Sequence, residues 1–330
     1  MNAPNASLRG LDLRAEIDRL RKERNAVILA HYYQAPELQD IADFVGDSLD
    51  LSRKAAATDA EEIAFCGVRF MAEVAKILSP EKIVVLPDME AGCSLEDSCP
   101  PEQFARFRAE HPDHIALTYI NCSAAVKAQS DIIVTSSSAE TILNQLPKDQ
   151  KIIFGPDRHL GAWFNRKTGR DMLLWPGACI VHEAFSETEL LKLKAQYPDA
   201  PVAAHPECPA FILDHADHVG STRAILDFAL RSPADTIIVA TEPHIIHQME
   251  KAAPHKHFIG APGADGNCNM CPYMAMNTME KLYVALRDLQ PRVEIDEATR
   301  LAALKPLGRM LEMASNTVGA GDLGARVSGD

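Results

Sequence analysis

Three cysteines recur along this sequence at similar intervals, each close to a glycine. Cys93 is followed by Cys179 after 86 residues, and Cys271 follows after 92 more, with Cys268 as the other candidate for the third place. Thiolates are soft ligands that suit iron–sulfur clusters and zinc. Three thiolates on a cluster of four irons leave one iron with an open position, where it can act as a Lewis acid. The same cysteines with His182 could instead form a closed zinc site.

A second set of residues, able to hold or move protons, follows three short apolar runs. These residues are His31 and Tyr33, Tyr119 and Asn121, and His205 and Glu207. Glu207 beside His205 is the best acid–base candidate, because a carboxylate near a histidine and a metal group can have its pKa moved in either direction. The alternatives are structural: Glu207 could cap a strand-end loop, and tyrosines at such a place more often pack than react.

Clusters rich in hydroxyl groups form a third set. They occupy residues 45–48, 134–138 and 219–222, and each precedes a stretch with helical character. A single cluster of this kind is usually an N-cap. Hydroxyls and free backbone N–H groups at a helix start also bind phosphate, with the help of the helix dipole. Because the clusters recur at corresponding places, we predict a shared anion pocket that includes Ser48, Ser136 and Thr222, with Ser221 as a further candidate.

The elements that must position these residues form a repeat of about 85–90 residues, a length typical of small domains. The strands of the three units are expected at residues 26–30, 114–119 and 201–205, then at 62–65, 151–154 and 236–239, and last at 82–86, 172–175 and 257–260. Strands that alternate with helices predict parallel sheets of about four strands, covered on both faces. Functional groups gather beyond the carboxyl ends of such strands. Three units around a common axis would share one central cavity, whereas three units in a row would have unrelated loops.

The bulk properties restrict the class of protein. The chain has 330 residues, a formal net charge of −13 and 47% hydrophobic residues, which allows two or three domains with full cores. The acidic balance argues against nucleic acid and anionic membrane surfaces as partners. No run approaches the ~20 apolar residues of a membrane helix, and the start lacks the features of a signal peptide. We therefore expect a cytoplasmic protein whose eight cysteines are thiols or metal ligands rather than disulfides.

Several motifs of this sequence, taken in order, resemble those of the quinolinate synthase family, the A protein of bacterial NAD biosynthesis. They lie at residues 30–34, 90–100, 119–122, 175–183, 205–208, 219–222 and 267–277, and so span most of the chain. The resemblance implies an α/β fold of three homologous three-layer αβα domains with small parallel sheets, arranged about a pseudo-threefold axis with a central active site. The expected domains are residues 12–100 with C-terminal helices 276–315 packing on them, 101–190 and 191–275, before a mobile tail at 316–330.

The resemblance also implies an activity, that of a transferase that condenses iminoaspartate with dihydroxyacetone phosphate to quinolinate, releasing phosphate and two waters. It implies one [4Fe–4S] cluster per chain, with Cys93, Cys179 and Cys271 as ligands. The iminoaspartate would come from L-aspartate oxidase or aspartate dehydrogenase. The residues implied to act on the intermediates are Glu207, His205 and Tyr33, and those implied to bind substrate are His31, Ser48, Tyr119, Asn121, Ser136 and Thr222.

Some alternatives stay open. Some relatives carry a further cysteine just before the pair Cys268 and Cys271, and this sequence does not. A disulfide between the two would remove one ligand, so redox control is a further hypothesis. A zinc enzyme on the same cysteines and a non-catalytic cluster protein that senses oxygen or iron are competing classes. The acid–base residues and hydroxyl clusters argue against a sensor, which needs neither.

Overall fold

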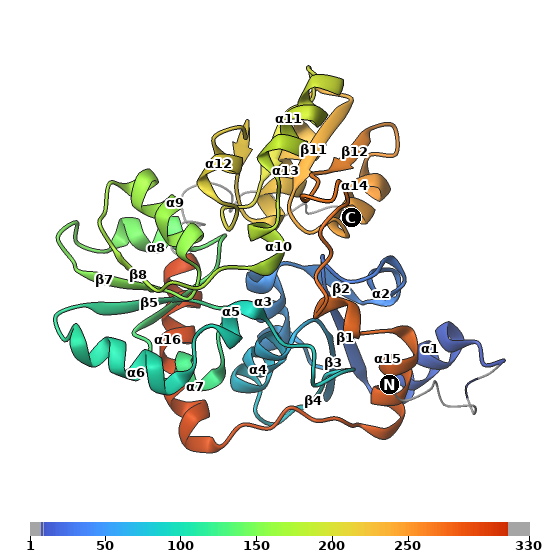
Figure 1. The fold of residues 1–330 in the computed structure, drawn as a ribbon. Coiled ribbons are helices and arrows are strands. Elements are labelled where there is room, and N and C mark those ends of the chain that lie inside the picture. The colour runs from blue at the N-terminus through green and yellow to red at the C-terminus, as the bar shows by residue number, and fades with distance from the viewer. Residues whose placement is uncertain (1–7, 9, 316–330) are drawn as a thin grey trace, which may run out of the picture.

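Three separate four-stranded sheets form the framework of the molecule (Figure 1). The computed structural model describes residue 8 and residues 10–315, so the tail at 316–330 lies outside the described residues. The strand order is the same in each sheet: β2-β1-β3-β4, β6-β5-β7-β8 and β10-β9-β11-β12. Every strand pairing in these sheets is parallel. The α/β fold class with three small parallel sheets is therefore confirmed.

The first sheet shows why these sequences form strands between helical layers. Nearly every residue of its two central strands, β1 (Ala26–His31) and β3 (Glu62–Cys66), is buried, as a sheet covered on both faces requires. The edge strands are β2 (Phe44–Gly46) and β4 (Ile83–Val85). The helices are α1 (Leu13–Glu23), α2 (Pro36–Ile41), α3 (Ser48–Ala57), α4 (Arg69–Leu78) and the single turn α5 (Ser94–Asp97).

The second and third units repeat this plan. The second has strands β5 (Ile115–Tyr119), β6 (Ile132–Val134), β7 (Ile152–Gly155) and β8 (Leu173–Leu174), with helices α6 (Pro101–Glu110), α7 (Ala124–Lys127), α8 (Ala139–Gln145), α9 (Arg158–Thr168) and α10 (Ile180–Glu183). The third has strands β9 (Val202–Ala204), β10 (His218–Val219), β11 (Thr236–Ala240) and β12 (His257–Gly260), with helices α11 (Glu187–Gln196), α12 (Ala210–Leu213), α13 (Thr222–Arg231) and α14 (Ile245–Ala252).

The strand that the sequence left unplaced in each unit is the short edge strand next to the first one. β2, β6 and β10 have only two or three residues and end just before or within the hydroxyl clusters. They pair with only one neighbour each, so their sequences carry little of the buried apolar pattern that marks a central strand. The strand expected at 172–175 is likewise reduced to the two residues of β8.

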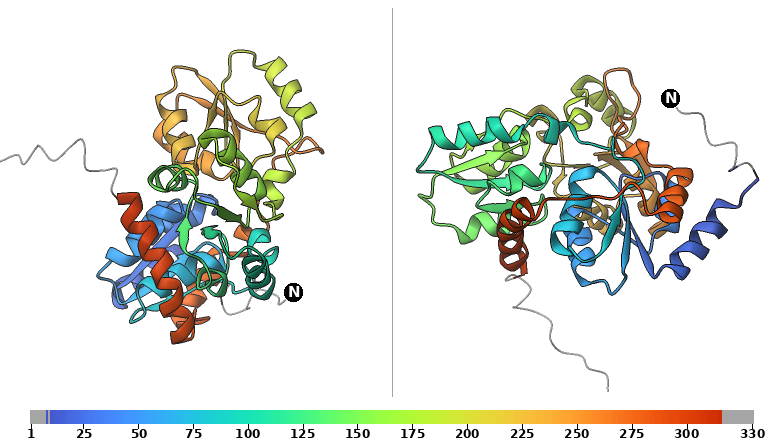
Figure 2. Two further views of the ribbon diagram at one scale, coloured as in Figure 1. Left: turned by 90° about the vertical axis from the view of Figure 1, so that its left-hand side faces the viewer. Right: turned by 90° about the horizontal axis from the view of Figure 1, so that it is seen from below.

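The C-terminal helices correct one expectation. Helix α15 (Met279–Asp288) packs on α1 and β3 of the first unit. Helix α16 (Glu297–Ser315) instead contacts α7, α8 and β6 of the second unit, together with α4 of the first, and runs along both units in Figure 2. Its buried residues, among them Leu307 and Met310, join an apolar core that the first two units share. This helix therefore ties two units together rather than covering one.

Candidate active site

The carboxyl ends of the three sheets meet at one cavity. All of the residues that the sequence assigned to the site line it: His31, Tyr33, Ser48, Cys93, Tyr119, Asn121, Ser136, Cys179, His205, Glu207, Thr222 and Cys271. His182 lines it as well, whereas Ser221 does not. The three units are thus arranged around a shared cavity. The alternative arrangement, three units in a row with unrelated loops, is excluded.

Two histidines hold corresponding positions in the first and third units. His31 ends β1 and His205 follows β9, and each ring is almost fully buried. The backbone N–H of Tyr33 donates to His31 Nδ1 at 3.2 Å, and that of Glu207 donates to His205 Nδ1 at 3.3 Å. Because Nδ1 is the acceptor in both rings, the proton of each neutral ring lies on Nε2. Burial lowers the pKa of His31 to about 3 and that of His205 to about 4, so both are neutral at pH 7.

The Glu207 carboxylate is buried in the wall of the cavity. The Tyr119 hydroxyl donates to Oε1 at 2.6 Å. His182 Nδ1 lies 3.0 Å from Oε2, a close contact without the angle of a hydrogen bond. Burial alone would raise the pKa of Glu207, but His205, His182 and the Tyr119 hydroxyl outweigh it, so this pKa lies below its ordinary value. Burial and the neighbouring Glu207 in turn raise the pKa of Tyr119 well above its ordinary value.

Tyr33 joins the first unit to the third. Its hydroxyl lies 2.9 Å from Thr222 Oγ1 and 2.6 Å from Thr241 Oγ1. Burial, and then the charge of Glu207, raises the pKa of Tyr33 well above its ordinary value, so the phenol is protonated at neutral pH. Thr241 follows β11 directly and also contacts His182 Nε2 at 3.0 Å.

The hydroxyl clusters lie at helix starts, as predicted, with a correction to the capping residues. The N-cap of α3 is Asp47, whose carboxylate accepts from Leu49 N and Asp50 N, and Ser48 is the first helical residue, free to face the cavity. Ser221 caps α13 by accepting from Ala224 N, which leaves Thr222 facing the cavity. Within residues 10–315, no lysine or arginine lines the cavity. An anion there would have to bind neutral donors, such as hydroxyls, backbone N–H groups and the N–H groups of uncharged side chains.

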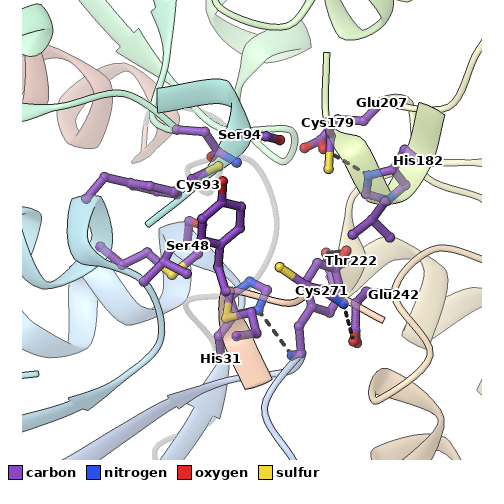
Figure 3. A pocket seen from close by; sticks show the side chains of 18 of the residues that line it. His31, Ser48, Cys93, Ser94, Cys179, His182, Glu207, Thr222, Glu242 and Cys271 are labelled. Atoms are coloured by element: carbon purple, nitrogen blue, oxygen red, sulfur yellow. Dashed lines mark hydrogen bonds and ion pairs between the residues drawn. The ribbon is translucent and has the colours of Figure 1, made fainter. Parts of the chain in front are cut away.

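Cys93, Cys179 and Cys271 lie around one pocket (Figure 3), and each begins a single helical turn. The carbonyl of Cys93 accepts from Asp97 N, that of Cys179 from Glu183 N and that of Cys271 from Ala275 N. Burial raises the pKa of all three thiols, and backbone N–H groups of the same turns lower it. Burial is the larger effect, so the pKa of each thiol lies above its ordinary value, and the backbone N–H groups of the three equivalent turns offset this only in part.

Short contacts join the three cysteine turns to one another. Ser94 Oγ accepts from Ile180 N at 3.1 Å, which links the turn after Cys93 to the turn after Cys179. The Tyr273 hydroxyl donates to Asp97 Oδ2 at 3.0 Å, and Cys271 N donates to Glu242 Oε1 at 3.3 Å. These contacts keep loops from three units at one end of the cavity.

The donor set fits a cluster better than a single zinc ion. All described cysteines are free thiols, including Cys268 and Cys271. Tetrahedral zinc with bonds of ~2.3 Å to sulfur brings its ligand atoms within about 4 Å of one another. Among the described residues, the ligand atoms that come within 4.8 Å of one another are those of Cys179, His182 and Glu207, and the three thiols do not. The three thiols therefore do not form a closed zinc site together, whereas a cluster of several atoms has ligands that lie farther apart.

Other polar residues of the site were missed by the sequence analysis. Glu242, 1% exposed, lines the cavity and accepts from the backbone N–H groups of His244 and Cys271. Thr241 is as buried as Glu242, and its hydroxyl forms hydrogen bonds with side chains that line the cavity. Both directly follow the apolar strand β11. The sequence analysis looked for functional polar groups only after the first strand of each unit. The same search after β11, the third strand of its unit, would have identified Thr241 and Glu242.

Comparison with known proteins agrees with this description. The fold and the site define an α/β protein of three repeated units around a cavity with one thiol from each unit. Residues 15–312 match the family described as quinolinate synthetase A protein, and this chain belongs to that family.

Relatives named quinolinate synthase are similar to this chain over nearly their whole length. The relative from Trichormus variabilis is 58% identical over 306 residues, covering 92% of this chain and 94% of its own. The relative from Synechococcus is 59% identical over 306 residues, with 92% and 96% covered. In the described part of the chain, no helix is long and apolar enough to cross a membrane.

Proposed function

We propose that this protein is a quinolinate synthase that condenses iminoaspartate with dihydroxyacetone phosphate and releases phosphate and two waters. The observation that carries the proposal is one cavity that combines a thiol from each repeat with Glu207, Tyr33 and His205. Membership of the family and the names of its relatives support it. The iminoaspartate would be supplied by L-aspartate oxidase or aspartate dehydrogenase.

Cys93, Cys179 and Cys271 are the residues that would hold one [4Fe–4S] cluster per chain. When bound, such a cluster would supply an iron with an open position that acts as a Lewis acid on a substrate oxygen or nitrogen. The cysteines must bind as thiolates. The backbone N–H groups of the turn at each cysteine favour that charge, which supports this assignment.

Substrate binding would fall to the end of the cavity that the helix starts line. The hydroxyls of Ser48, Ser136 and Thr222 are suited to donate hydrogen bonds to a phosphate group. Asn121 Oδ1 is buried and has no hydrogen-bond partner in the described structure, so it is open to a donor on the substrate. Because the cavity offers hydroxyls and amides in place of lysine and arginine, it can bind both a phosphate and carboxylates without holding them too tightly for release.

The proton transfers of the reaction would be handled by Glu207 and its neighbours. Ionised and oriented by the Tyr119 hydroxyl, Glu207 can accept a proton from a substrate carbon or nitrogen as a general base. His31 and His205, neutral and protonated on Nε2, can donate hydrogen bonds to substrate oxygens without adding charge. The high pKa of Tyr33 keeps its proton available as a donor.

The test is an anaerobic one. Protein purified without oxygen should be brown, contain about four irons per chain, and form quinolinate from the two substrates. Zinc in place of iron would refute the cluster assignment. An iron-containing protein that forms no quinolinate would favour the sensor class over the enzyme.

A further inference from the structure

Four charged side chains gather between the first and second units, outside the cavity. They are Arg69 and Glu73 on α4, Glu96 on α5 and Lys127 on α7, and none of them lines the cavity. Lys127 is fully buried and Glu96 nearly so. Their charges act on one another: burial raises the pKa of Glu73, and then Lys127 lowers it and Glu96 raises it. We call these four residues the charge network.

One end of the charge network holds the turn that begins at Cys93. Arg69 Nε and Nη2 donate to Glu96 Oε1 at 3.2 and 3.0 Å. The backbone N–H of Arg69 donates to the Ala91 carbonyl at 2.7 Å. Arg69 therefore binds the chain on both sides of Cys93, before it at Ala91 and after it at Glu96.

The other end holds the loop that carries Asn121. Lys127 Nζ donates to the carbonyl of Cys122, and Glu73 Oε2 accepts from Ala124 N at 2.7 Å. Asn121 directly precedes Cys122, and its Oδ1 has no hydrogen-bond partner in the described structure. Because no such bond fixes this oxygen, its place in the cavity depends on the backbone of its own loop.

Stability is a poor explanation for these charges. Burying an ion costs desolvation free energy, and apolar side chains of similar size often stabilise a protein as well or better. The two positive and two negative charges also balance, so the network adds no net charge beside the cavity. What the charges do supply is a set of hydrogen bonds to two loops, and α4 carries one member of each end.

We propose that the charge network positions the iron–sulfur ligand Cys93 and the substrate-binding Asn121 relative to each other, an inference that rests on the proposed function. All four members are positioning residues, since none touches the cavity. The two ends have separate effects. The Arg69 end determines how firmly iron is held, and the Lys127 end determines how well substrate binds.

The first test measures iron release to a chelator from anaerobic holoprotein. Arg69→Met removes the donors to Glu96 and should speed release about 10–100-fold, the range for groups that orient metal ligands. Arg69→Met combined with Glu96→Gln leaves no unpaired charge and gives the same comparison if the single variant folds poorly. Arg108→Met is the matched control, because Arg108 Nη2 donates to Asp131 Oδ2 at 2.7 Å away from the cavity. Release at the wild-type rate from the Arg69 variants would overturn the proposal.

The second test measures substrate binding in the iron-loaded protein. Lys127→Met combined with Glu73→Gln removes both charges at this end, and the glutamine can still accept from Ala124 N. This variant should raise the KM for at least one substrate about 2–15-fold, the worth of one hydrogen bond, and keep kcat within about threefold. Its iron release should stay at the wild-type rate.

Lys76→Met is the control for the second test. Lys76 also lies on α4, and its Nζ donates to the carbonyls of Pro80 and Lys82 at 3.0 and 2.9 Å, outside the cavity. It should keep the wild-type KM. An unchanged KM in the Lys127 variant would overturn the proposal, and so would iron release as fast as that of the Arg69 variant, because a general loss of structure would then explain both.

The two measurements also separate this inference from the proposed function. Iron release needs no turnover. A wild type that holds iron but forms no quinolinate would remove the proposed function, and faster release from the Arg69 variant would still support the role of the charge network at Cys93.

Discussion

Single residues of the site repeat one local arrangement. In the first and third units, the backbone N–H two residues after a strand-end histidine donates to its Nδ1. In the second unit, Tyr119 holds the histidine place and instead donates to Glu207. The same backbone path thus produces two neutral hydrogen-bond donors and one residue that orients the carboxylate. Divergence between repeats at this one position separates the roles that an acid–base site needs.

Replacing the carboxylate isolates its role. Glu207→Gln keeps the shape and the contact with Tyr119 but cannot accept a proton, so kcat should fall about 10²–10⁴-fold, the usual contribution of a general base. Iron content should match the wild type, because Glu207 is not among the proposed ligands. The assay is quinolinate formation beside iron analysis of the same sample. A glutamine variant at full rate would remove Glu207 from the acid–base role.

Two neighbouring cysteines offer a matched pair for the ligand assignment. Cys271 lines the cavity, whereas Cys268, three residues earlier, is exposed and lies outside it. Cys271→Ser should lose the iron and all quinolinate formation, because serine is a poor ligand for a soft metal centre. Cys268→Ser should keep both under reducing conditions. Iron loss in the Cys268 variant would shift the third ligand to that residue and contradict the assignment.

At the scale of elements, the turns that hold the cysteines depend on close backbone packing. Gly177 lies two residues before Cys179, and an added Cβ there would lie 2.3 Å from Ser98 Oγ and 2.5 Å from the Pro156 carbonyl oxygen. No side chain fits without moving the backbone, so the loop of the second unit would separate from the loop after Cys93. This contact is one reason that a glycine stands near this cysteine.

Gly177→Ala should therefore lower the free energy of unfolding by about 1–3 kcal/mol, as overpacking of a tight site does, and should reduce iron content. Gly308→Ala is the control: it lies within α16, where an added Cβ meets nothing within 4 Å. That variant should be neutral or more stable by up to about 1 kcal/mol, because alanine favours the helix. The measurement is chemical unfolding of both variants. An equally stable Gly177 variant would show that this backbone can shift freely.

The sequence predicted the central strands and the site residues better than the edges and the C-terminal helix. Strong runs such as β1 and β11 are buried on both faces and leave a clear apolar signal. The edge strands β2, β6 and β10 are too short to carry one. The partner of α16 is set by the surfaces of two units, and these exist only after folding. Thr241 and Glu242 could have been predicted, because both directly follow an apolar strand. The sequence analysis used this criterion only for the first strand of each unit.

At the scale of the whole molecule, the cavity exists only while the three units keep their relative positions. The first and second are joined by α16 and by the Ser137 hydroxyl, which donates to Asp47 Oδ2 at 2.5 Å. The first and third are joined at the surface by Asp40 of α2. Its Oδ1 accepts from Lys251 Nζ at 2.6 Å and lies 2.9 Å from His247 Nε2, both on α14. These contacts place a charge between two units, away from the cavity.

The contact at Asp40 should make the stability of the molecule depend on pH. Hydrogen bonds from Lys251 and then His247 lower the pKa of Asp40 below its ordinary value of 3.8. A carboxyl group whose pKa is lowered by folding stabilises the folded state at pH values above its unfolded pKa, and this contribution is lost as the pH falls through the folded value.

Asp40→Asn removes the charge but keeps the size of the side chain. At neutral pH it should lower the free energy of unfolding by about 0.2–1 kcal/mol, the range of partly exposed ion pairs. The difference between wild type and variant should shrink steadily below pH 3.8, because the wild-type carboxylate is then protonated too. Denaturant unfolding of both proteins from pH 7 to pH 3 measures it, and added salt should reduce it as well. A difference that stays constant over this range would show that the contact acts through packing, and that charge does not hold the first and third units together here.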